Sequence, residues 1–160
     1  SYMVRLIEDA GAQYVFAENT AAQTLPIDFE RAYYLTCRSD YWLNTSGCES
    51  LDDLRRQYPR LSGTPPVRAG RVYDNNGRRN AAGGSDFWES GVLRPDRVLA
   101  DLVGIFHPEL AETGELYYYR RLEGHRPSGG CGTTVLHFRQ KFCRSEKNSY
   151  LSLNSACRIR

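Results

Sequence analysis

Three short apolar runs, separated by helix-forming segments, constrain the fold of this chain more than any other feature. The runs are residues 14–17 (YVFA), 41–43 (YWL) and 71–74 (RVYD). In the first two, apolar residues stand at consecutive positions, which suits strands buried on both faces, as in parallel sheets. Strands that alternate with helices are typical of layered α/β folds. We therefore predict an α/β, three-layer, Rossmann-like lobe whose short, mostly parallel sheet is flanked by helices.

Capping residues, glycine and proline indicate where the helices begin and end. Apolar residues recur at helical spacing over residues 2–10, and Gly11 is a natural stop. Asp28 opens a second helix, and Ser50 caps a third because its hydroxyl can accept a hydrogen bond from the first turn. The doublet at residues 65–66 (PP) predicts a turn or an extended linker.

The stretch 83–110, GGSDFWESGVLRPDRVLADLVGIFHPEL, combines two different patterns. Its first half has the composition of a binding loop, since Phe87 and Trp88 offer stacking surface beside the acceptor Asp86. Its second half predicts a helix that starts at Pro95 and carries one broad apolar face. An ordinary loop followed by a packing helix is the alternative interpretation.

Charge divides the chain near residue 123. Residues 1–123 carry 14 basic and 18 acidic side chains, whereas residues 124–160 carry 7 basic and 1 acidic. An abrupt change of this kind marks a boundary in origin or role. The length of 160 residues suits one sizeable core, and no apolar run approaches the roughly 18 residues that span a membrane.

Several segments resemble the C-terminal lobe of a periplasmic substrate-binding protein. They are SYMVRLIEDAGAQYVFAEN, DYWLN, GRVYDNN and the stretch 83–110 followed by ELYYYRRL. The type is the helix-linked class that serves ABC importers of ferric siderophores, haem and cobalamin. This resemblance covers residues 1–122 and implies a ligand-binding protein rather than an enzyme, with no resident cofactor and no nucleic-acid partner. It also implies a periplasmic or extracytoplasmic location, with the membrane reached only through the permease or a lipid anchor outside this chain.

The chain departs from that family at both ends. The N-terminal lobe, the linking helix and the first strand of the C-terminal lobe are absent, so we expect a lobe that is incomplete at its N-terminus. Residues 123–160 do not follow the family pattern and are expected to form an irregular, basic tail. Two explanations of this tail stay open: out-of-frame translation, or a basic appendage for an anionic surface or nucleic acid. Its weak strand candidates are residues 135–138 and 150–153.

The resemblance also implies which residues meet the ligand. Phe87, Trp88 and Trp42 would stack on it, while Asp86 and Asn44 would anchor its polar groups. In open α/β sheets, ligands bind beyond the carboxyl ends of the strands. Residues 18–19, residues 44–45 and the loop 75–88 follow these strands and would therefore contribute to the cleft.

Permease docking is implied for Glu30, with Asp28 as the second choice. In the family, a glutamate just after this strand-to-helix turn projects from the tip of the lobe and meets arginines of the permease. From the sequence alone, Glu30 is simply an acid in the first turn of a helix, where the helix dipole favours it.

Other chemistry has little support in the sequence. The five cysteines form no C-x-x-C pair, so no zinc site is predicted. No local signature of a Ser-His-Asp or Cys-His site and no phosphate-binding loop occurs, so no catalytic residues are predicted. Cys37 and Cys48 could form a disulfide in an oxidising compartment, although Cys37 is expected to be buried on a helix face. Residues 117–119 (YYY) suit an edge strand or a packing strap, with haem ligation as the alternative. A flavodoxin-like enzyme domain that binds a phosphate-bearing cofactor is the alternative for the whole chain.

Overall fold

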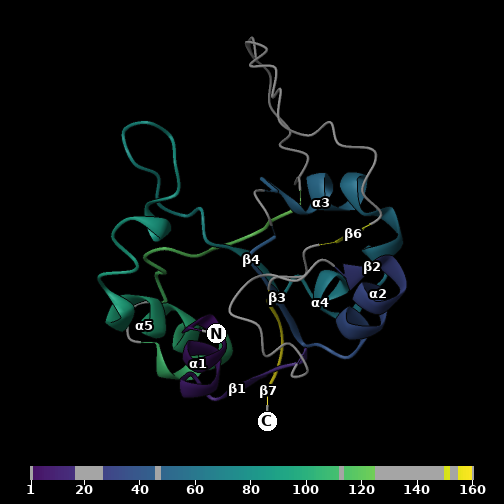
Figure 1. The fold of residues 1–160 in the computed structure, drawn as a ribbon, viewed down its shortest axis with the longest axis horizontal. Helices are drawn as coiled ribbons and strands as arrows, with labels where there is room; N and C mark the ends of the chain where they lie inside the picture. The colour runs from purple at the N-terminus through teal and green to yellow at the C-terminus, as the bar shows by residue number, and fades with distance from the viewer. Residues whose placement is uncertain are drawn as a thin grey trace.

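The computed structural model describes residues 2–16, 27–45, 48–111, 114–124, 150–151 and 155–159 (Figure 1). The helices are α1 (Tyr2–Asp9), α2 (Phe29–Cys37), α3 (Leu51–Gln57), α4 (Pro65–Arg68) and α5 (Pro95–Phe106), with 3-10 turns η1 (Pro59–Leu61), η2 (Asp86–Trp88) and η3 (Pro108–Leu110). The strands are β1 (Ala12–Tyr14), β2 (Ile27–Asp28), β3 (Tyr41–Leu43), β4 (Val72–Asp74), β5 (Arg120–Arg121), β6 (Tyr150–Leu151) and β7 (Ser155–Ile159).

The main sheet is mixed, in the order β1-β7-β3-β4-β5. Only β3 and β4 pair in parallel, whereas β1–β7, β7–β3 and β4–β5 are antiparallel. The prediction of a mostly parallel sheet is therefore wrong. Two of the antiparallel pairs arise because β7 lies between β1 and β3 and runs opposite to both. The third arises because β5 runs opposite to β4.

The expectation of an irregular tail is wrong for the end of the chain. β7 pairs with β1 through Cys157 opposite Tyr14, and with β3 through Ala156 opposite Trp42. Ala156 and Cys157 are both fully buried. A second, two-stranded sheet joins β6 to β2, which confirms part of the strand candidate at residues 150–153. The candidate at residues 135–138 lies outside the described residues, and the division of the chain at residue 123 stays a prediction.

Helices cover both faces of the main sheet, which confirms the α/β class. One hydrophobic cluster joins Trp42 and Val72 to apolar residues of α2, α3 and α4. A second cluster joins Tyr41 and Leu43 to apolar residues of α1 and α5. In Figure 1, α1 and α5 lie to the left of the strands, while α2, α3 and α4 lie to the right. Adjacent residues of β3 thus serve opposite cores.

The predicted helix boundaries are largely confirmed by capping contacts. Asp28 caps α2 by accepting a hydrogen bond from the backbone N–H of Arg31 at 2.8 Å. Ser50 caps α3 in the same way, with the backbone N–H of Asp53 at 3.1 Å. The linker predicted at residues 65–66 is wrong, because these prolines occupy the first positions of α4, where their missing N–H costs nothing.

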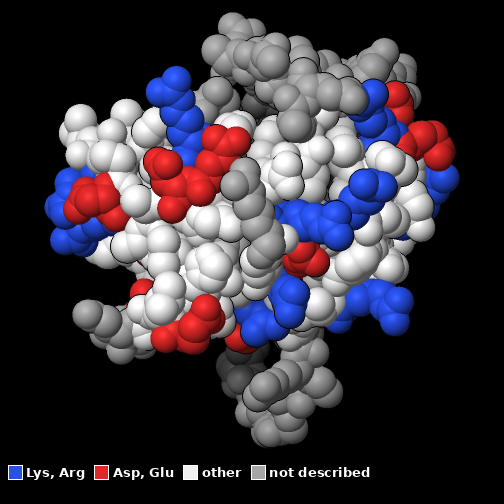
Figure 2. Space-filling model, turned by 90° about the horizontal axis from the view of Figure 1, so that it is seen from below, with Lys and Arg blue, Asp and Glu red and all other residues white. Residues whose placement is uncertain are grey.

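None of the helices in the described segments is long and apolar enough to cross a membrane. Acidic and basic side chains are interspersed over the face of the molecule shown in Figure 2.

Candidate ligand-binding loop

The candidate site begins at the carboxyl ends of the two parallel strands. After β3, Asn44 adopts a left-handed conformation (φ 56°), and its backbone N–H donates to the carbonyl oxygen of Tyr73 at 2.9 Å. Three polar residues next to these strand ends, Thr45, Asp74 and Asn75, are buried. The chain after β4 then forms the loop at the upper left of Figure 1, which leads to η2.

Side-chain hydrogen bonds give this loop a defined shape. The carboxamide oxygen of Asn80 accepts from the backbone N–H groups of Ala82 at 3.1 Å and Gly84 at 2.8 Å. Its nitrogen donates to Glu89 at 2.6 Å, and the Ser85 hydroxyl donates to the carbonyl oxygen of Asn75 at 2.6 Å. These hydrogen bonds join the beginning of the loop to its end and fix the turn between them.

Arginines tie the loop after β4 to the loop after β3. Arg120 donates to Asn76 at 2.6 Å and to the carboxylate of Glu49 at 3.0 Å. Arg79 pairs with the other carboxylate oxygen of Glu49. The two carboxyl-end loops therefore form one connected edge, although their ion pairs are largely exposed and each adds only about 0–1 kcal/mol.

Asp86 stabilises the loop through its side chain. Its carboxylate pairs with Arg78 at 2.8 Å and accepts a hydrogen bond from the Ser90 hydroxyl at 2.9 Å. The backbone carbonyl of Asp86 also accepts from the N–H groups of Glu89 and Ser90. A ligand that used Asp86 would thus meet a carboxylate whose position is already set.

The neighbouring aromatics divide into a support and an exposed surface. Phe87 is 3% exposed, and its ring meets those of Tyr118 and Tyr119 edge to face at 5.9 and 5.7 Å. Trp88 is 65% exposed, and its ring packs edge to face with that of Phe87 at a centroid distance of 5.1 Å. A buried phenyl group thereby supports an indole that is open to solvent.

Trp42 and Asn44 are not part of the exposed surface around Trp88. Trp42 is 2% exposed and belongs to the hydrophobic cluster on the opposite face of the sheet from Phe87. Its predicted contact with a ligand stays a prediction, and the indole lies in the core in this structure. Asn44 lies at the correct strand end, but its side chain is directed toward Tyr119 rather than standing free.

A single carboxylate organises the three consecutive tyrosines. Asp101 of α5, 4% exposed, accepts hydrogen bonds from the backbone N–H groups of Tyr117, Tyr118 and Tyr119 at 2.8, 2.7 and 3.0 Å. Burial raises the pKa of Tyr119 far above its ordinary value, so its phenol keeps its proton even in alkaline solution that ionises an exposed tyrosine. Tyr118 and Tyr119 are packing groups, which agrees with the predicted strap and disfavours haem ligation by these two.

The residues predicted for docking lie together at the start of α2. Glu30 projects into solvent, with 81% of its side chain exposed, and forms an ion pair with Arg60 at 3.3 Å. Asp28 is occupied as the helix cap described above. Both side chains are exposed, and Glu30 carries no capping hydrogen bond, so its carboxylate is the better placed of the two to meet a partner.

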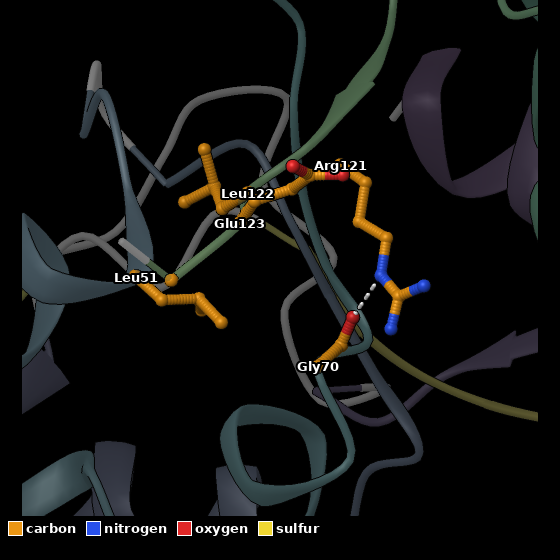
Figure 3. Close-up of a pocket in the computed structure, with 6 residues that line it drawn as sticks. Leu51, Gly70, Arg121, Leu122 and Glu123 are labelled. Atoms are coloured by element: carbon orange, nitrogen blue, oxygen red, sulfur yellow. Dashed lines mark hydrogen bonds between the residues drawn. The ribbon is translucent and has the colours of Figure 1, made fainter. Parts of the chain in front are cut away.

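Two hollows lie away from the predicted ligand residues. One, about 220 Å³, is shown in Figure 3, where Arg121 reaches across to donate a 2.6 Å hydrogen bond to the carbonyl oxygen of Gly70. Gly70 has φ +64°, and a Cβ there would lie 2.8 Å from the Arg121 guanidinium. The other, about 530 Å³, lies between α5 and residues 110–111 and 114–116. Neither is lined by Asp86, Phe87 or Trp88.

Comparison with known proteins gives a likeness but no family. No family model matches the chain, and no solved structure matches it. Over 106 residues it is 24% identical to an uncharacterized lipoprotein of Methanocaldococcus jannaschii. The match covers 66% of this chain and 24% of that protein, so the chain spans about a quarter of the length of this relative.

The cysteines and other metal-binding side chains form no centre in the described parts of the chain. Cys37 is exposed and Cys48 is buried, and the disulfide considered for them is not formed. The expectation that Cys37 is buried is wrong because it faces outward at the end of α2. Within the described ranges, no group of three or more His, Cys, Asp or Glu side chains is placed to hold a metal ion.

Sequence reasoning missed a cationic element beside the loop. The guanidinium carbon of Arg78 lies 4.7 Å from the centre of the Tyr117 ring, and that of Arg97 lies 4.3 Å from it. These residues are up to 39 positions apart in the chain. No local motif joins them, so no sequence signal could have identified the contact.

Proposed function

We propose that this chain is one lobe of the substrate-binding component of an ABC importer for an iron chelate or corrinoid. The observation that carries the proposal is Trp88, whose indole is 65% exposed on a braced loop that follows the carboxyl end of β4. An exposed indole contributes little to the core, and a planar or bulky chelate offers its face a stacking partner. Capture would place the ligand against Trp88 in a cleft completed by a second lobe.

The location and the partner follow from the same proposal. The matched relative is named a lipoprotein, which supports an extracytoplasmic site of action with membrane contact through a lipid anchor or the permease. Glu30, exposed on the first turn of α2, would dock on cationic side chains of that permease. Exposed charges of this sort affect orientation and association rate more than raw affinity.

Calorimetric titration of the chain with cobalamin, haem and a panel of ferric siderophores tests the proposal. We expect weak but specific binding of one class, because a single lobe buries only part of a ligand. Trp88→Ala should weaken that binding about ten-fold or more. The matched control is Leu93→Ala, which removes another exposed apolar side chain (79%) close in sequence. Binding that is equal in both variants, or binding of none of the ligands, would count against the proposal.

Docking is tested separately, with the permease reconstituted in nanodiscs. Glu30→Ala should lower permease association and leave ligand binding unchanged, whereas Glu109→Ala, at an acid outside α2 that is 67% exposed against 81% for Glu30, should alter neither. Loss of ligand binding with intact docking in Glu30→Ala would show that this helix has been assigned the wrong role.

A further inference from the structure

The loop after β4 begins with a chemically labile pair of residues, Asn76 and Gly77. Of the seven asparagines in the chain, Asn76 is the one followed by glycine. Asparagine side chains are prone to lose their amide group. The reaction starts when the backbone nitrogen of the next residue attacks the amide carbon, and glycine hinders that attack least because it has no Cβ. Asn76 is half-buried and Gly77 is exposed, so water and hydroxide can reach the pair.

The fold requires the glycine of this pair. A Cβ at position 77 would lie 2.8 Å from the carbonyl oxygens of both Tyr118 and Tyr119. Both contacts are with backbone atoms, so a larger residue would force the segment before β5 to move. The labile pair therefore follows from the close approach of two backbone segments, and a bulkier neighbour cannot protect Asn76.

Two hydrogen bonds hold the reacting groups in place. The carboxamide oxygen of Asn76 accepts from Nε of Arg120 at 2.6 Å, and the Gly77 N–H donates to the carbonyl oxygen of Tyr118 at 2.9 Å. The Tyr118 peptide is itself fixed, because its N–H donates to Asp101 at 2.7 Å. While both bonds persist, the Gly77 nitrogen keeps its proton and cannot turn toward the side chain before it. Ring closure thus requires a local opening that breaks both contacts.

We propose that Asn76 is a deamidation site of this protein, and that Arg120 and the Tyr118 carbonyl slow the reaction by holding the site closed. In the open state, the Gly77 nitrogen loses its proton to solvent base and forms a bond to Cγ of Asn76. The side-chain nitrogen takes up a proton and leaves as ammonia, which gives a cyclic imide. Water then opens the imide to aspartate or isoaspartate. The net reaction consumes one water, releases one ammonia and needs no oxidant or reductant.

The product changes the edge that joins the two carboxyl-end loops. Arg120 also pairs with Glu49 at 3.0 Å, so a carboxylate at position 76 brings a second acid to the same guanidinium. Isoaspartate also adds a carbon atom to the main chain and displaces the Gly77 N–H from Tyr118. The modification thus alters the start of the loop that leads to Trp88, and the inference does not depend on the proposed function.

Mass spectrometry of the full chain tests the site. The chain is incubated at mildly alkaline pH, both native and unfolded in guanidinium chloride, and trypsin then releases the peptide of residues 72–78 for sequencing. We expect conversion of Asn76 to be at least about ten-fold slower in the native chain than in the unfolded chain, because the closing hydrogen bonds keep the open population small. Asn80, half-buried in the same loop and followed by alanine, is the internal comparison and should convert later than Asn76.

Substitution shows which contact protects the amide. Arg120→Gln removes the guanidinium from Asn76, and we expect conversion in the folded variant to accelerate about ten-fold. Arg79→Gln is the matched control, because Arg79 pairs with the same carboxylate of Glu49 but lies three residues along the loop from Asn76. That variant should convert at the rate of the unsubstituted chain.

Each result decides one part of the proposal. Conversion of Asn80 ahead of Asn76, or no conversion of Asn76 in the native chain, would overturn the site. Equal rates in the native and unfolded chains would overturn the protection, as would a slower reaction in folded Arg120→Gln, where the guanidinium would then be an activating group. If circular dichroism shows that Arg120→Gln does not fold, the ratio of native to unfolded rates in the unsubstituted chain decides the question of protection.

Discussion

The carboxylate of Asp101 accepts a hydrogen bond from the backbone N–H of Tyr118 at 2.7 Å, and this contact links α5 to the segment before β5. Two further bonds, from Tyr117 and Tyr119, complete the arrangement. Without the carboxylate, three N–H groups beside a buried aromatic cluster would lose their acceptor. The packing of Tyr118 and Tyr119 against Phe87 therefore depends on a residue of α5 that would touch no ligand.

Replacing this carboxylate should be costly. Asp101→Ala leaves buried donors unsatisfied, and we expect the free energy of unfolding to fall by about 3 kcal/mol or more, measured by urea denaturation. Asp96→Ala, an exposed acid one helical turn and a half away on α5, is the control and should have a much smaller effect. Equal effects of the two substitutions would mean that the three hydrogen bonds contribute little.

Substitution of Phe87 should lower the free energy of unfolding far more than substitution of its neighbour Trp88. Phe87→Ala empties a buried site among tyrosine rings, so we expect a loss of about 3–5 kcal/mol. Trp88→Ala removes an exposed indole and should change stability by no more than about 0.5 kcal/mol. Thermal and urea unfolding of both variants would check this. A large loss in Trp88→Ala would identify the indole as core packing instead of binding surface.

The place of β7 in the sheet predicts the outcome of two substitutions on one strand. Ala156→Asp puts a charge at a fully buried position opposite Trp42 and should unfold the domain or lower its melting temperature strongly. Arg158→Asp, at an exposed position of the same strand, should be tolerated. Circular dichroism melts suffice as the measurement. A native-like melt for Ala156→Asp would show that β7 is not part of the folded sheet.

Cys157 predicts a dependence of stability on alkaline pH. Burial raises the pKa of its thiol well above the ordinary value, so the thiol ionises near pH 8.5 only in the unfolded chain. Stability is then fully present below about pH 8.5 and falls as pH rises above it, by about 1.4 kcal/mol per pH unit. Urea denaturation between pH 7 and 9.5 should show this slope in the native protein and in Cys37→Ala, and a reduced slope in Cys157→Ala. An unchanged slope in Cys157→Ala would assign the effect to other groups.

Features set by short-range interactions could be predicted from the sequence. Asp28 and Ser50 cap their helices because the acceptor and the N–H it meets are three residues apart. Pro95 starts α5 because its ring favours a first helical turn wherever it occurs. The apolar run of β3 identified a strand buried on both faces, and Trp88 was recognised as a candidate for an exposed surface.

The tertiary structure alone decided the features that join distant segments. Nothing near Ser155–Ile159 indicates that this strand inserts between β1 and β3, because its partners lie more than 100 positions away and the pairing uses backbone groups common to every residue. The same reason places Trp42 and Phe87 in different cores, since the strand pleat, fixed by the sheet register, turns Trp42 toward α2, α3 and α4. The arginines around Tyr117 and the three bonds to Asp101 likewise exist only because folding brings separate segments together. Local sequence determined where elements begin and end, while long-range packing determined which side chains meet.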